Sequence, residues 1–186
     1  MKLKLLLFIG LTLSLQFSIA SGAEKAETKW GETLKQSMSL LGHRNMIIVA
    51  DSAYPLQTGK GVKVIATGAD HQSVVKQVCE SIKASKAVRP LIALDSEFAY
   101  VPEEHAPGAA KLRQELMTLL KGSSKEPIRE ALHADLLKEV AERSVEYQVV
   151  VFKTTGTVPY SSVFFTLDCG YWSAEAEKDL RAKMSK

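Results

Sequence analysis

The chain has 186 residues, of which 46% are hydrophobic and 24% are charged. This composition is typical of a globular protein and excludes disordered, fibrous and polytopic membrane proteins. The 24 basic residues include Lys2 and Lys4 of a predicted leader, which leaves 22 basic against 21 acidic side chains. Because the charges nearly balance and alternate in sign along the presumptive helices, the sequence predicts no nucleic-acid partner.

Residues 1–23 have the pattern of a signal peptide. Lys2 and Lys4 precede the apolar run 5–11, and small residues ending at Ala20 or Ala23 offer cleavage sites. An uncleaved membrane anchor is the alternative, but polar residues dilute the apolar stretch, whereas a spanning helix needs about 20 predominantly apolar residues. We therefore expect an exported protein, periplasmic or secreted, with no stable membrane insertion after cleavage.

The rest of the chain predicts one domain over residues 24–173, which begins with a polar linker at residues 24–29. A charged tail follows over residues 174–186, and we expect it to form a surface helix or to fray.

Strands and helices alternate along this domain. The continuous apolar run 46–50 predicts a strand buried on both faces, and it ends at Asp51, as the later strand 91–94 ends at Asp95. Further strands are expected at residues 62–66, 147–153 and 160–167. Helices are expected at residues 34–41, from the cap Asp70 to residue 83, at 109–120 and at 126–143. This alternation favours an α/β fold with helices layered around a mostly parallel sheet.

The only cysteines are Cys79 and Cys169. An oxidising compartment permits a disulfide between them, but two separate buried thiols fit the sequence equally well. The chain has no CxxC, HExxH or Cys/His cluster with metal-ligand spacing, so we expect no metal.

Asp51 is the first candidate for a functional site, because ligands of open α/β sheets bind beyond the carboxyl ends of the strands. His43 lies eight residues earlier, and a histidine beside a carboxylate can take and return a proton near neutral pH. From spacing alone, a capping aspartate and a surface histidine are the simpler interpretation.

Two stretches at opposite ends of the domain carry a family resemblance. The first is Leu41-Gly42-His43 followed by the apolar strand and Asp51, with Pro55 nearby. The second, residues 150–165, has a Thr-Gly turn that leads to Tyr160 and a further strand. With the block between them, residues 34–171 resemble the ribose pyranase / fucose mutarotase family (RbsD/FucU), which implies that family's α/β fold.

The resemblance implies an enzyme that interconverts anomers, or pyranose and furanose rings, of a free monosaccharide by general acid/base ring opening, without a cofactor. His43 matches the family's catalytic histidine, Asp51 its site aspartate and Tyr160 its tyrosine. His133 is the match for a second family histidine, although a solvent-exposed residue on a charged helix is the alternative. Ser162 stands where the family has an asparagine and would contact the substrate through a shorter group with fewer donors.

The same resemblance implies a ring-like homo-oligomer with sites at subunit boundaries. His71 and His105 match nothing in the family and are expected on the surface. Residues 97–126 look longer than the corresponding family segment, which would reshape one wall of the pocket.

An exported carbohydrate-binding protein of the same fold without turnover is the alternative function, and a purely structural oligomer component is a third.

Overall fold

The computed structural model describes residues 17–185, and residues 1–16 of the predicted leader lie outside this range. In chain order the elements are α1 Phe17–Leu40, β1 Met46–Ala50, β2 Val62–Ala66, α2 His71–Ser85, β3 Val88–Asp95, the 3-10 helix η1 Ser96–Tyr100, α3 Ala109–Lys121, β4 Arg129–Ala131, α4 His133–Arg143, β5 Val149–Lys153, β6 Val163–Cys169 and α5 Ala174–Met184. None of the helices within residues 17–185 is both long enough and apolar enough to cross a bilayer.

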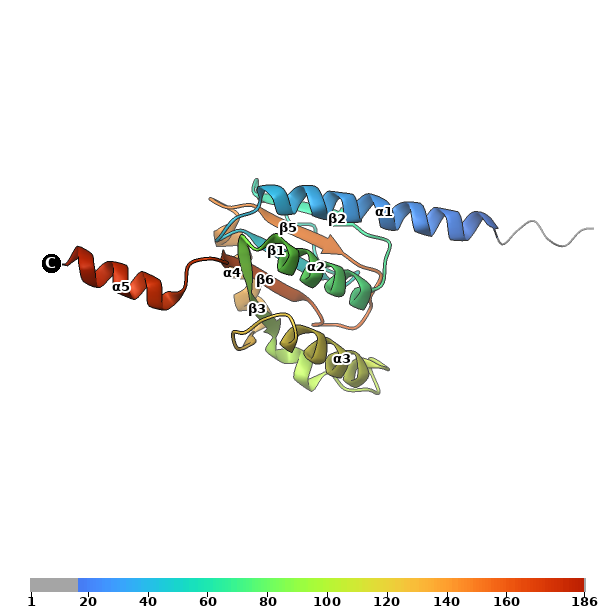
Figure 1. Ribbon diagram of the computed structural model, residues 1–186. Coiled ribbons are helices and arrows are strands. Elements are labelled where there is room, and N and C mark those ends of the chain that lie inside the picture. Colours follow the sequence, from blue (N-terminus) through green and yellow to red (C-terminus); the bar gives the residue numbers. More distant parts are fainter. Residues whose placement is uncertain (1–16, 186) are drawn as a thin grey trace, which may run out of the picture.

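A six-stranded sheet in the order β2-β5-β1-β6-β3-β4 forms the middle of the molecule (Figure 1). Strand β5 pairs in parallel with β1 and β2, and β4 pairs in parallel with β3. Strand β6 lies between β1 and β3 and runs antiparallel to both. The predicted α/β fold with a mostly parallel sheet is therefore confirmed, with β6 as the antiparallel strand.

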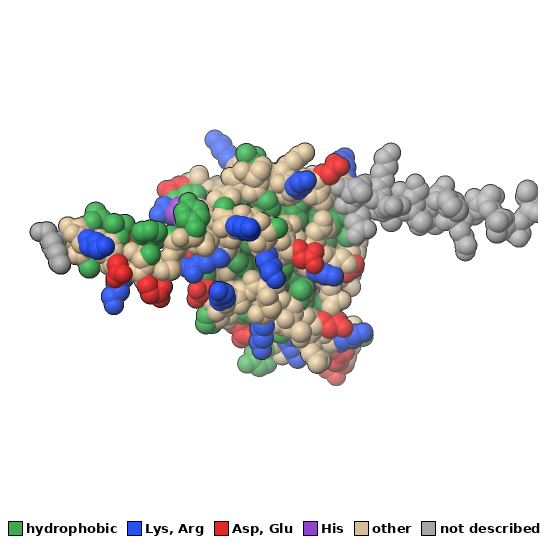
Figure 2. Space-filling view, in the orientation of Figure 1, with side chains coloured by type: hydrophobic (Ala, Val, Ile, Leu, Met, Phe, Trp, Pro, Cys, Tyr) green, Lys and Arg blue, Asp and Glu red, His purple; other side chains and the backbone are tan. Residues whose placement is uncertain are grey.

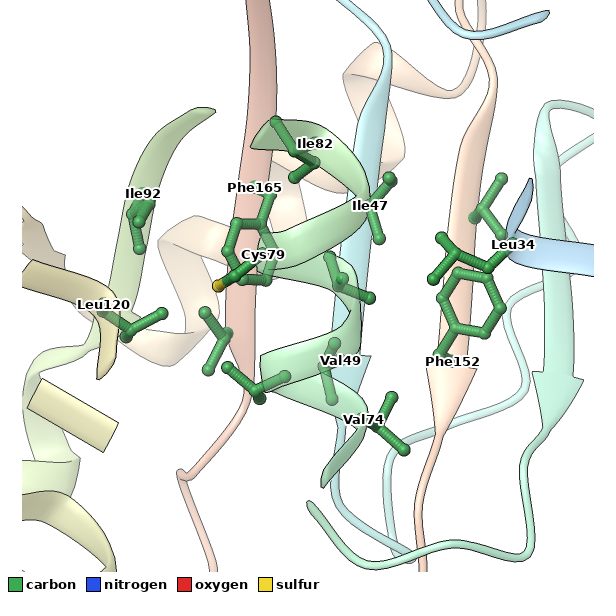
Figure 3. Close-up of a cluster of buried hydrophobic side chains, with 14 of the residues drawn as sticks. Leu34, Ile47, Val49, Val74, Cys79, Ile82, Ile92, Leu120, Phe152 and Phe165 are labelled. Carbon is green, nitrogen blue, oxygen red and sulfur yellow. The ribbon is translucent and has the colours of Figure 1, made fainter. Parts of the chain in front are cut away.

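All five residues of β1 are buried, as its continuous apolar run predicts. Ile47 and Val49 belong to the core that α1, α2 and α3 cover, and Figure 3 shows α2 packed over this face of the sheet. Met46 and Ile48 face the opposite side, where α4 packs. Because side chains alternate across a strand, one short apolar run contributes to both cores and fixes β1 at the centre of the sheet.

Two predicted segments differ from the structure. Residues 24–29 continue helix α1 instead of forming a linker, because Glu, Lys and Ala favour helix and no Gly or Pro interrupts them. Residues 129–131, predicted as helix, form β4 beside β3, and α4 begins only at His133. Here the pairing with β3 overrides the helical pattern, and Pro127 disfavours helical backbone in the residue before it.

Charged side chains and the C-terminal tail lie at the surface of the molecule. Basic and acidic side chains are interspersed over the face seen in Figure 2. The tail forms α5, which projects from the body of the molecule (Figure 1) and contains no buried residue. Cys79, buried in α2, and Cys169, at the end of β6, are both free thiols.

Candidate functional site

The ends of three neighbouring strands meet at one edge of the sheet. Asp51 follows β1 and Asp95 ends β3, so both lie at the carboxyl ends of their strands. Ser162 precedes β6, which runs the other way, and Val163 at the start of β6 pairs with both Val49 and Leu94. The antiparallel strand therefore brings the beginning of β6 to the same edge as the two acids.

An open cavity of about 390 Å³ lies at this edge. It is lined by Asp51, Ser52, Ala53, Tyr54, Pro55, His133, Thr157, Pro159 and Tyr160. We call this cavity the cleft. It brings together three of the five site residues expected from the sequence, namely Asp51, His133 and Tyr160.

His133 and Tyr160 form one wall of the cleft. Their rings meet edge to face, with centroids 5.6 Å apart and planes inclined by 82°. The backbone N–H of His133, the first residue of α4, donates to both carboxylate oxygens of Glu97 at 3.1 Å, which fixes the start of the helix. Tyr160 has a φ of 58°, a left-handed backbone that is uncommon outside glycine and that turns the chain toward β6.

Asp95 lies behind His133 and is a site residue that the sequence reasoning did not select. Its side chain is fully buried, and its Oδ2 lies 3.1 Å from Nδ1 of His133. Burial, with smaller contributions from the charges of Glu97 and Asp51, raises the pKa of Asp95 to about 6, although His133 opposes the shift. Its position at a strand end, the same signal that selected Asp51, would have identified it.

Two hydrogen bonds hold the side chain of Asp51. Its Oδ1 accepts a hydrogen bond from the N–H of Ala53 at 2.8 Å, and its Oδ2 accepts one from the Ser162 hydroxyl at 3.4 Å. Ser162 is completely buried and does not line the cleft, and its hydroxyl hydrogen bond goes to the aspartate. Tyr54 also lines the cleft and is buried. This burial, followed by the charges of Asp95 and Asp51, raises the pKa of its phenol.

His71 is buried, so the expectation of a surface residue is wrong. Its Nδ1 lies 3.1 Å from Oγ1 of Thr154, which in turn donates to the carbonyl of Ala50, directly before Asp51. The ring packs beneath Gly156, where an added Cβ would approach His71 to 3.1 Å. Burial lowers the pKa of His71, while the Ser161 backbone and nearby acids oppose the shift less strongly. His105, by contrast, is exposed as expected.

His43 does not join the cleft within one chain. It is exposed in the loop before β1, whereas Asp51 follows the same strand, so the five buried residues of β1 separate them. At this end of β1, opposite the cleft, His43 lies near Asp168. Arg89 contacts Asp168 through Nε at 2.9 Å and Nη2 at 2.6 Å. Burial opposes the shift, but Arg89 and, more weakly, His43 lower the pKa of Asp168.

Comparison with solved structures shows the fold. RbsD of Bacillus subtilis, in complex with D-ribose, is 16% identical with a TM-score of 0.51, covering 72% of this chain and 88% of that one. FucU of Bifidobacterium longum is 14% identical with a TM-score of 0.51, covering 73% and 92%. Fucose mutarotase of Streptococcus pneumoniae, in complex with L-fucose, is 15% identical with a TM-score of 0.49, covering 70% and 87%.

No curated protein sequence matches this chain. Residues 31–170, most of the chain and all of the sheet, match the RbsD / FucU transport protein family. The protein therefore belongs to the RbsD / FucU transport protein family.

Proposed function

We propose that this protein binds a free monosaccharide and interconverts its cyclic forms by general acid/base ring opening. The observation that carries this proposal is the convergence of a carboxylate, an imidazole and a phenol, from Asp51, His133 and Tyr160, on one cavity of about 390 Å³. Sites for small molecules range from about 300 to 1,000 Å³, so the cleft suits a small ligand. Family membership supports a sugar, since the related B. subtilis RbsD holds D-ribose.

The chemistry needs two proton-transfer groups. One removes the proton from the anomeric hydroxyl while the other protonates the ring oxygen, so that the C–O bond of the ring breaks and an open-chain aldehyde forms. The carbonyl then turns, and the reverse transfers close the ring. In this scheme Asp51 accepts hydrogen bonds from sugar hydroxyls, and Tyr160 donates one while its ring lies against the apolar face of the sugar.

His133 and His43 are the proposed proton-transfer groups, and they require two copies of the chain. His133 lines the cleft, but His43 lies at the far end of β1. In a ring-like homo-oligomer, the loop that carries His43 would enter the cleft of the next subunit through a heterologous interface. We therefore propose that the complete site forms between subunits.

The alternative is a carbohydrate-binding protein without turnover. Ser162 supports it, because the hydroxyl is buried against Asp51 and leaves no side-chain amide to contact a ligand. Binding would then rest on Asp51 and Tyr160, with proton transfer impaired.

Exchange NMR on free pentoses, hexoses and deoxyhexoses separates the two functions. We expect the protein to accelerate exchange between ring forms of at least one sugar above the buffer rate, and His43→Ala and Asp51→Asn to abolish the acceleration. His105→Ala is the matched control, because His105 is exposed and does not line the cleft. Binding without acceleration would select the alternative. If the protein shows no binding and no acceleration, both functions are refuted.

We also propose export to the periplasm or the medium, on the basis of the N-terminal sequence. Intact mass measurement of the protein from each cell fraction tests this proposal. The expected result is an extracytoplasmic form that lacks the residues up to Ala20 or Ala23, and a full-length cytoplasmic form would contradict it.

A further inference from the structure

The Nδ1 atom of His133 lies close to a buried carboxylate. It is buried, it makes no well-aligned hydrogen bond within the described chain, and Oδ2 of Asp95 lies 3.1 Å from it. The His133 side chain as a whole retains 29% exposure. Since Nδ1 is buried, this exposure belongs to the other side-chain atoms, and Nε2 is not among the buried atoms of this residue, which lines the cleft.

We propose that Asp95 is a positioning residue that holds the neutral His133 ring in the tautomer with hydrogen on Nδ1, so that the Nε2 lone pair faces the cleft. The catalytic use of this arrangement rests on the proposed sugar-ring interconversion. The tautomer itself is a property of the protein without substrate.

The reason lies in hydrogen-bond chemistry. A neutral imidazole has one N–H and one acceptor nitrogen, and an ionised carboxylate only accepts. Opposite the ionised Asp95, the ring proton must therefore sit on Nδ1, and Nε2 remains free to take the proton of an anomeric hydroxyl. The imidazolium formed by that transfer is then stabilised by the buried negative charge behind it.

Several charged or titratable groups face Asp95. His133 approaches from α4, Glu97 from η1, and Asp51 and Tyr54 from the segment after β1. Burial and the two acids raise the pKa of Asp95 to about 6, whereas His133 opposes them. Lowering the pH through this value protonates the carboxyl group and removes the pure acceptor, so control of the tautomer is lost on the acid side.

The first test is nitrogen-15 NMR of the histidine side chains in the full chain without sugar, with His133→Gln used to assign the resonances of His133. We expect the bare, strongly downfield nitrogen of neutral His133 to be Nε2 and the protonated nitrogen to be Nδ1. A bare Nδ1, or equal populations of the two tautomers, would overturn the proposal. Because no substrate is present, this result does not depend on whether the protein turns over a sugar.

The second test is Asp95→Asn, whose amide can donate to Nδ1 and so favour the opposite tautomer. We expect the bare nitrogen to move to Nδ1, and kcat to fall by about 10²- to 10⁴-fold with little change in KM. Glu97→Gln is the matched control, because Glu97 contacts the backbone N–H of His133 and not its ring.

The control should leave the tautomer at neutral pH unchanged, and the loss of the Glu97 charge should only move the acid side of the pH profile to lower pH, because Glu97 raises the pKa of Asp95. An unchanged tautomer in a folded Asp95→Asn variant would contradict the proposal. If that variant does not fold, the nitrogen-15 NMR measurement on the unaltered chain still tests the proposed tautomer. Absence of turnover in the unaltered protein would refute the proposed function alone.

Discussion

His43 and Asp51 stand at opposite ends of strand β1, and every residue between Met46 and Ala50 is buried. A strand of five residues spans about 17 Å, so both groups of one chain cannot touch the same monosaccharide. The pair can serve one site only when two subunits meet. This separation leads to the first prediction.

Mixed oligomers of two inactive variants should regain activity. When equal amounts of His43→Ala and Asp51→Asn chains are refolded together, about a quarter of the random interfaces combine an intact His43 with an intact Asp51. We therefore expect exchange NMR to recover about a quarter of the unmixed wild-type rate, whereas each variant alone is inactive.

The matched control mixes His133→Gln with Asp51→Asn. Both changes fall in the same cleft, so every cleft in the mixture carries a defect and no activity should return. Light scattering should show the same oligomer in all mixtures. Recovery in the control, or none in the first mixture, would show that the site is not shared between subunits.

The buried His71 should make the protein less stable in acid. Burial lowers its pKa in the folded state, so below about pH 6.5 the unfolded chain takes up a proton that the folded chain does not. The free energy of unfolding should therefore fall as the pH drops, and His71→Gln should remove that component.

Urea unfolding between about pH 8 and pH 5 measures this effect. The stability advantage of wild type over His71→Gln should shrink as the pH decreases. With His105→Gln, an exposed control, the difference should stay constant. An advantage over His71→Gln that grows toward low pH would have the wrong sign and would contradict burial of the neutral ring.

Thr154 should contribute more to stability than its neighbour Thr155. The buried Thr154 hydroxyl donates to Ala50, lies beside His71 and accepts from the N–H of Gly156. Thr154→Val leaves these groups without the hydroxyl as a hydrogen-bond partner and should lower the free energy of unfolding by about 1–3 kcal/mol. Thr155→Val removes one exposed bond to Ala69 and should cost less than about 1 kcal/mol in the same urea titration.

Removal of residues 174–186 should leave the folded domain intact. Helix α5 buries none of its residues, and its hydrogen bonds and ion pairs are exposed. We expect the free energy of unfolding to change by less than about 0.5 kcal/mol. A larger loss in urea unfolding, or a smaller oligomer by light scattering, would show that the tail packs against another subunit.

Local patterns predicted the elements whose signals are local. The apolar run of β1 identifies a central strand, and Asp70 marks the start of α2, where its side chain accepts from the N–H of Ser73. The order of the strands is not local. Strand β6 follows β5 in the chain but lies on the other side of β1, a choice made by packing on both faces of the sheet.

The site shows the same division between local and distant information. The family motifs selected Asp51, His133 and Tyr160, which line one cleft. His71 appeared to be an exposed residue at a helix start, because its buried hydrogen-bonding neighbour, Thr154, lies 83 positions away. Asp95 carried the strand-end signal of Asp51, but its contact with His133 depends on how η1 and β4 place the start of α4.

The central strand also determines when the chain can fold during synthesis. Both sheet neighbours of β1, strands β5 and β6, are made on the order of 100 residues after it. A nascent chain that ends before Val149 has no partner for either edge of β1, so the backbone N–H and C=O groups of this strand stay unpaired. Such non-local pairing slows folding, so the polypeptide remains unfolded until its last third has been made.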